Sequence, residues 1–205
     1  LFTAEHKERM KHLSVPIVIL AQRLDGYSCV YSDDYHASLD LTSRLAKTGH
    51  VFGYINAESR DEAVGRSRKK GFEDGLSQAG QEHAPRYYAE AVFSMESGYQ
   101  MAKKLFTDHP DIDTLLCATD TIASGALRYF HEQEIPVPEQ VQIAGFGDSS
   151  IARATTPTLT TVHFFYEEAG SEAGKILLDM MQEKEHPLNR ELKLGFSTIV
   201  RDSTR

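Results

Sequence analysis

The chain has 205 residues, of which 40% are hydrophobic and 25% are charged, a composition typical of a folded globular protein and not of a disordered one. Its formal net charge is -8, and Lys and Arg never form a run of five. This balance of charge excludes a surface built to hold the phosphate backbone of a nucleic acid.

Short runs rich in β-branched and aromatic residues alternate with longer segments in which apolar residues recur at helical spacing. The runs that predict strands are 15–20, 28–33, 51–56, 87–93, 113–119, 141–147 and 194–201. Alternation of this kind predicts an α/β fold in which helices cover mostly parallel sheets.

Two of the expected helices carry apolar stripes that predict a face packed on a sheet. The first stripe comprises Met95, Tyr99, Ala102 and Phe106, and the second comprises Ala169, Ala173, Ile176, Leu177 and Met180. Two other helices are expected to end near 47–49 and 78–80, where a glycine takes the left-handed conformation that closes a helix.

The first residues and the cysteines bear on where the protein works. Residues 1–14 are charged and amphipathic, unlike a secretory leader. We expect the sequence to begin in the middle of a secondary-structure element, as the sequence of a fragment would. Apolar runs stay well below the roughly 18 residues of a membrane span. Cys29 and Cys117 each lie in an apolar run, which indicates buried, reduced thiols and a cytoplasmic protein.

Motifs for catalysis are missing from the sequence. It contains no G-x-S-x-G, no glycine-rich loop that would cradle a phosphate and no H-E-x-x-H. The nine histidines are scattered, and most flank expected turns or helix ends. We therefore expect neither an enzyme nor a bound metal ion or cofactor.

Four segments carry a family resemblance, and together they cover nearly the whole chain. Residues 118–164 contain ATDTIASGAL, VPEQVQIAGFGD and TPTLTTV in that order. Weaker matches are VPIVILAQR at 15–23, SDDYHASLDLTSRLAKTGH at 32–50 and RSRKKGFEDGLSQAG at 66–80. In these segments the chain resembles the LacI/GalR family of bacterial transcriptional regulators.

The resemblance implies a type I periplasmic-binding-protein-like fold, with two doubly wound parallel-sheet lobes and a ligand in the cleft between them. Residues 1–32 and 163–187 would then form an N-terminal lobe that lacks its first strands. Residues 33–162 and 188–205 would form the C-terminal lobe. The three crossovers between the lobes are expected near 31–33, 162–163 and 187–192.

The resemblance also implies a function. The chain is expected to be the effector-binding and dimerisation core of a sugar-responsive repressor, with a sugar or a sugar phosphate as its effector. A cytoplasmic homodimer without membrane contact would reach operator DNA only through a helix-turn-helix headpiece that is absent from this chain. The alternative is a periplasmic sugar-binding component of an ABC transporter, and an enzyme of doubly wound fold is the third class.

Arg68 stands where the family has an effector-binding arginine, three residues before Gly71. A guanidinium group grips vicinal hydroxyls or a phosphate with two parallel hydrogen bonds. The alternative is a solvated arginine in the basic segment 66–70, a segment that would also suit a phosphorylated sugar. Phe93 stands where the family has an aromatic that stacks on a sugar ring, with core packing as its alternative role.

The remaining ligand-binding candidates follow predicted strands or match family positions. Thr119 and Asp120 lie at an expected strand-to-helix turn, which favours Asp120 as the N-cap of the helix and Thr119 as a ligand contact.

Gly147 replaces a family aspartate, so Asp148 is expected either to bind the sugar in its place or to cap the next turn. Gln22 is a candidate partner for a sugar hydroxyl, and Phe164 is a candidate second stacking face.

Overall fold

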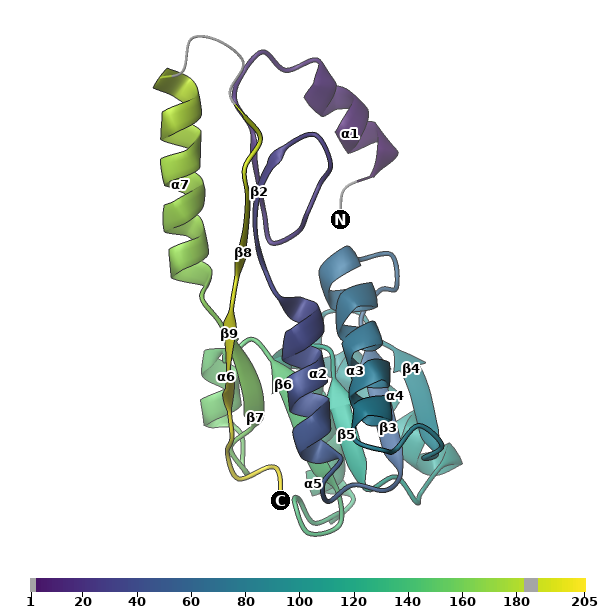
Figure 1. Ribbon diagram of the computed structural model, residues 1–205. Coiled ribbons are helices and arrows are strands. Elements are labelled where there is room, and N and C mark those ends of the chain that lie inside the picture. Colours follow the sequence, from purple (N-terminus) through teal and green to yellow (C-terminus); the bar gives the residue numbers. More distant parts are fainter. Residues whose placement is uncertain (1–2, 183–187) are drawn as a thin grey trace. The chain divides into compact units, whose positions relative to one another are not determined.

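The computed structural model describes residues 3–182 and 188–205. The chain divides into two compact units, the first formed by Leu1–Asp33 with Phe165–Gly195 and the second by Asp34–Phe164 with Phe196–Arg205. The predicted α/β fold with parallel sheets is present in both (Figure 1).

The first unit is a small parallel sheet with one long helix. Its elements are α1 (Ala4–Lys11), β1 (Val18–Leu20), β2 (Ser28–Ser32), α7 (Tyr166–Gln182) and β8 (Glu191–Leu194). The strand order is β1-β2-β8, and both pairings are parallel. Val30 of β2 packs against Ala169, Ala173 and Ile176 of α7, so the predicted stripe of this helix faces a strand.

The second unit is a doubly wound sheet with helices on both faces. It contains α2 (Asp34–Leu45), β3 (Phe52–Asn56), a π-helix η1 (Glu62–Ser67), α3 (Arg68–Gln78), β4 (Arg86–Glu90), α4 (Met95–Asp108), β5 (Thr114–Cys117), α5 (Asp120–Glu132), β6 (Gln142–Phe146), α6 (Ser150–Ala154), β7 (Thr160–Phe164) and β9 (Phe196–Ile199). The order is β4-β3-β5-β6-β7-β9, with only β9 antiparallel to its neighbour.

Alternate residues of the central strands build two separate cores, as the period of two in a strand requires. Tyr54 and Leu116 face α2 and α3, where Leu41 and Phe72 are buried. Ile55 and Cys117 belong to the other core, which α4 and α5 cover. The sheet is thus buried on both faces, which explains why its strands read as continuous apolar runs.

Several predicted boundaries differ from the observed ones. The segment 194–201 is two strands and not one, because β8 pairs with β2 in the first unit while β9 pairs with β7 in the second. Strand β7 was not predicted as an element.

The boundaries between the two units lie at 33/34, 164/165 and 195/196, so the crossovers expected near 31–33 and 162–163 lie within two residues of a boundary and the third does not. Residues 188–195 were expected in the C-terminal lobe, and the pairing of β8 places them in the first unit. Of the crossover expected at 187–192, residue 187 lies outside the described residues, as do 183–186 of the lobe expected to end at 187.

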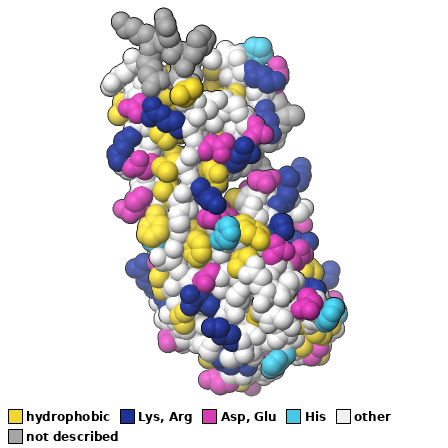
Figure 2. All heavy atoms as spheres, in the orientation of Figure 1, with side chains coloured by type: hydrophobic (Ala, Val, Ile, Leu, Met, Phe, Trp, Pro, Cys, Tyr) yellow, Lys and Arg dark blue, Asp and Glu magenta, His cyan; other side chains and the backbone are white. Residues whose placement is uncertain are grey.

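Both cysteines are buried free thiols, as predicted. Within the described residues, no helix is long and apolar enough to cross a membrane. On the face shown in Figure 2, acidic and basic side chains are interspersed, and neither sign forms a continuous patch.

Candidate functional site

The carboxyl ends of four parallel strands meet at one edge of the second unit's sheet, which is where ligands bind in open α/β folds. These strands are β3, β5, β6 and β7. Six predicted ligand-binding residues belong to the second unit, and most of them lie at or just after these strand ends. Gln22 belongs to the first unit.

Arg68 is the centre of a buried cluster on the α2/α3 face of the sheet, here called the Arg68 cluster (Arg68, Asp34, Phe146 and Phe164). Arg68 is only 5% exposed, and its Nε donates to Asp34 Oδ1 at 2.7 Å. Its Nη1 donates to the Ala118 carbonyl oxygen at 2.6 Å. The guanidinium group lies 4.9 Å from the ring centroid of Phe146 and 5.0 Å from that of Phe164.

Close packing of α3 on α2 brings Arg68 to Asp34. A Cβ atom at Gly71 would collide with the backbone carbonyl of Tyr35, so only glycine permits this approach. Ser38 of α2 then donates from its hydroxyl to the Arg68 carbonyl oxygen at 2.6 Å. The solvated arginine that the sequence left as an alternative is therefore wrong for Arg68, because the side chain is enclosed.

A second group of polar residues occupies the α5/α6 face of the same edge, here called the aspartate network (Asp120, Asp148, Ser149, Arg153, Thr161, His163 and Arg201). Asp120 is 1% exposed. It accepts hydrogen bonds from the Thr161 hydroxyl at 2.5 Å and from the Ser149 backbone N–H at 2.9 Å. Burial raises the pKa of the Asp120 carboxyl despite these hydrogen bonds.

Asp120 is not the N-cap of α5. Thr119 has the extended backbone of a cap, and its hydroxyl accepts from the Ile122 N–H at 3.2 Å. The capping role expected of Asp120 is therefore wrong by one residue, and Asp120 instead joins α5 to the loop that follows β6.

Asp148 adopts a left-handed backbone with φ of 46°, and its carboxylate contacts two arginines and one histidine. Its carboxylate lies 2.5 Å from Arg201 Nη2, 3.1 Å from His163 Nδ1 and 3.2 Å from Arg153 Nη2. Partial burial acts to raise the pKa of Asp148, but the hydrogen bonds and charges of Arg201 and Arg153 outweigh it and lower that pKa.

Phe93 and Gln22 lie outside both groups. Phe93 follows the end of β4, which β3 and β5 separate from β6 in the sheet order, and it is 54% exposed. Core packing is therefore not its role, and contact with a ligand stays a prediction. Gln22 is partly buried and directly follows Ala21, whose φ is 67°.

Sequence reasoning did not predict Asp34, Phe146, His163 and Arg201 as members of these groups. Asp34 had a usable signal, because an acidic residue at the start of an amphipathic helix lies near the carboxyl ends of strands in this fold class. Arg201 gave no such signal, since 53 residues separate it from Asp148.

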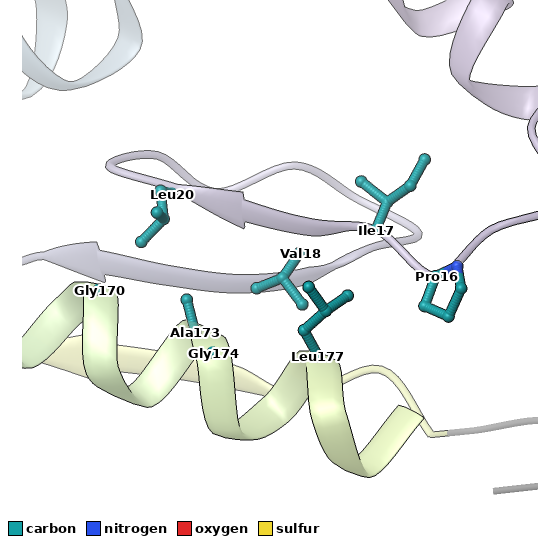
Figure 3. Close-up of a pocket in the computed structure, with 8 residues that line it drawn as sticks. All are labelled: Pro16, Ile17, Val18, Leu20, Gly170, Ala173, Gly174 and Leu177. Atoms are coloured by element: carbon teal, nitrogen blue, oxygen red, sulfur yellow. The ribbon is translucent and has the colours of Figure 1, made fainter. Parts of the chain in front are cut away.

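The first unit contains an apolar groove beside its edge strand β1 (Figure 3). It has a volume of about 370 Å³ and is lined by Pro16, Ile17, Val18, Leu20, Gly170, Ala173, Gly174 and Leu177. None of the predicted ligand-binding residues lines it, and it offers no charged side chain to orient a sugar.

A doubly wound unit with charged and aromatic side chains at the carboxyl edge of its sheet is typical of α/β proteins that bind ligands. Residues 42–204 match the family described as the periplasmic binding protein-like domain, and the chain belongs to this family. The predicted fold class is thereby confirmed.

The relatives of this chain are bacterial transcriptional regulators. The regulator TreR of Escherichia coli is 30% identical over 91% of this chain and 57% of its own length. The solved structure of the transcription regulator GntR from Chromobacterium violaceum is 32% identical, with a TM-score of 0.85 over 100% of this chain and 76% of that one.

A LacI family regulator from Enterococcus faecium, solved with bound ribose, has a TM-score of 0.87 at 24% identity over 98% of this chain and 75% of that one. That similarity shows the fold alone. The chain spans just over half the length of the curated relatives it matches.

Proposed function

We propose that this chain is the effector-binding and dimerisation core of a sugar-responsive transcriptional repressor of the LacI type. The relatives support regulation of transcription over a transporter component, because TreR and the other curated relatives are regulators. On this proposal the protein is not an enzyme, works in the cytoplasm as a homodimer, and reaches operator DNA through a separate headpiece.

The observation that carries the proposal is the placement of Arg68. A guanidinium group fixed between a carboxylate and two aromatic rings, at the carboxyl edge of the sheet, is preorganised for contact with a polar ligand. The relative from Enterococcus faecium that holds ribose has the same fold, which supports a sugar as the ligand. Gln22, Phe93, Thr119, Asp120, Asp148 and Phe164 are proposed as further contacts.

Isothermal titration calorimetry against neutral and phosphorylated monosaccharides and disaccharides tests the proposal. We expect at least one to bind with a Kd below about 1 mM, a free energy of about -4 kcal/mol or better. Binding by none of them at millimolar concentration would overturn the proposed function.

A matched pair of variants assigns the binding to Arg68. Arg68→Lys keeps a positive charge beside Asp34 but loses the planar fork, so we expect affinity to fall at least about tenfold. Arg66→Lys changes a side chain that is 61% exposed on the same segment, and its affinity should match that of the wild type. Equal affinities for both variants would remove Arg68 from the site.

Sedimentation analysis tests the homodimer. The proposal expects a mass near twice that of the 23.0 kDa chain, and a monomer at all concentrations would contradict that part of it.

A further inference from the structure

Each cationic side chain of the segment 66–70 is paired with a carboxylate. The pairs are Arg66 with Glu62 at 3.2 Å, Arg68 with Asp34 at 2.7 Å, Lys69 with Glu73 at 3.7 Å and Lys70 with Asp74 at 2.6 Å. This segment was the part of the sequence expected to suit a phosphorylated sugar. Pairing removes the excess positive charge on which that expectation rests.

The pair at Arg68 differs from the other three because it is enclosed. The side chains of Arg68 and Asp34 are each only 7% exposed, whereas those of Lys70 and Arg66 are more than half exposed. Exposed pairs open readily and are screened by water. A buried pair stays closed, because a carboxylate left unpaired away from water costs much more than the pair itself gains.

The donors of Arg68 are largely occupied within the protein. Both Nε and Nη2 lie 2.7 Å from the same oxygen of Asp34. Nη1 donates to the Ala118 carbonyl oxygen, and the two phenylalanine rings cover the guanidinium group. A phosphate normally binds arginine through two parallel hydrogen bonds, and that arrangement here would place a dianion against the Asp34 carboxylate.

Other polar groups at this edge favour hydroxyl donors. Asn56, at the carboxyl end of β3, is 5% exposed, and its Oδ1 has no hydrogen-bond partner among the described residues. Asp120 at the end of β5 adds a buried carboxylate whose partners are hydroxyl and backbone N–H groups. A sugar hydroxyl donates to such acceptors, whereas a phosphate dianion has no proton to donate.

Given the proposed function, we infer that the effector is an uncharged polyhydroxy compound and that Asp34 is the residue that rejects phosphate esters. Its carboxylate compensates the charge of Arg68 and repels a second anion in a place where water screens little. The same carboxylate leaves Arg68 able to orient a neutral hydroxyl.

Calorimetry with two matched ligand pairs tests this inference, using ribose with ribose 5-phosphate and glucose with glucose 6-phosphate at constant ionic strength. For the wild-type chain we expect the neutral member of a pair that binds to have at least about tenfold higher affinity than its ester. An ester that binds as tightly as its parent sugar would overturn the inference while supporting the proposed function. Failure of all four to bind, together with failure of the broader panel, would overturn both.

Two aspartate variants locate the selectivity. Asp34→Asn and Asp74→Asn remove the same charge from the same unit, the first at a buried pair and the second at an exposed one. We expect Asp34→Asn to shift the ratio of affinities toward the ester by about tenfold, and Asp74→Asn to leave it unchanged. Equal shifts of this ratio in both variants would mean that the net charge of the protein, and not Asp34 in particular, determines the selectivity against esters.

The wild-type measurement decides the ligand class even if Asp34→Asn fails to fold. In that case Asp34→Glu keeps the carboxylate and serves as the second variant. It should still reject both esters, and acceptance of an ester by Asp34→Glu would contradict the role of Asp34.

Discussion

The Arg68 cluster and the aspartate network lie on opposite faces of one sheet edge, and they treat buried charge in different ways. In the first, Arg68 pairs with Asp34 and two phenylalanine rings cover the guanidinium group. The second holds two carboxylates, of which Asp148 pairs with Arg201 and Arg153 while Asp120 accepts from hydroxyl and N–H donors. Burial at these strand ends therefore does not by itself set the pKa of a carboxyl group, because nearby charges and hydrogen-bond donors also shift that pKa.

The largest expected effect comes from breaking the buried pair. Arg68→Ala leaves the Asp34 carboxylate enclosed without its cation, so we expect a loss of about 3–5 kcal/mol in the free energy of unfolding. Urea denaturation measures it, with Arg66→Ala as the exposed control that should change stability by less than about 0.5 kcal/mol.

The double variant Arg68→Met with Asp34→Leu distinguishes the cost of an uncompensated buried charge from the cost of losing the packing of the arginine side chain. Replacing both charges by apolar groups removes the unpaired carboxylate, so most of the lost stability should return. A double variant as unstable as Arg68→Ala would show that the shape of the arginine, and not its charge, holds the cluster together.

The next effect concerns Asp148. Replacement by Asn weakens charged hydrogen bonds to Arg201 and Arg153 and should cost about 2 kcal/mol at pH 7. The pKa of Asp148 is lowered in the folded chain, so its stabilising contribution is present above the unfolded pKa near 3.9 and is lost as the pH falls through the folded pKa. Stability of the wild type and Asp148→Asn should therefore converge in acid, as measured by urea denaturation between pH 3 and pH 7.

Asp120 should show the opposite dependence on pH, with a smaller effect of about 1 kcal/mol. Burial raises its pKa in the folded chain, so ionisation stabilises the unfolded chain more than the folded one. The stability of the wild type relative to Asp120→Asn should therefore fall as the pH rises through the unfolded pKa near 3.9, and it should level off above the folded pKa. A dependence of the same sign as that of Asp148 would contradict the contrast between the two carboxylates.

The smallest effect on stability is expected outside both groups, at Phe93. Its ring is 54% exposed, so Phe93→Ser should change the free energy of unfolding by less than about 0.5 kcal/mol. If the ring stacks on the effector as proposed, affinity for the sugar should still fall several-fold, a loss of about 1 kcal/mol. Unchanged affinity in calorimetry would remove Phe93 from the proposed site.

The sequence predicted the architecture better than it predicted the partners of each charge. Periodicity located most strands of the sheets, because a strand buried on both faces is a continuous apolar run. The same signal failed at 194–201, where β8 and β9 are separated by a single glycine and belong to different sheets. Nothing in a continuous run shows at which residue the chain changes its pairing partner.

In the candidate site, the sequence likewise predicted single residues but not the side chains that they contact. Arg68 was predicted from its position before Gly71, but its partner Asp34 is 34 residues away and depends on how closely α3 packs on α2. At 119–120 both residue types are good N-caps, and only the extended backbone of Thr119 assigns the cap to it. Contacts formed by tertiary packing are therefore the part that a single sequence leaves open.

Strand β9 and the residues after it have a consequence for the order in which the protein folds during synthesis. Ser203 is fully buried, and its hydroxyl donates to the Ile143 carbonyl oxygen at 2.6 Å. The same hydroxyl oxygen accepts a hydrogen bond from the Thr160 N–H at 2.8 Å. A nascent chain that has reached only residue 195 therefore carries β7 as an unpaired edge, open to pairing with another nascent chain on the same messenger RNA. The second unit gains β9 only when residues 196–205 have emerged from the ribosome.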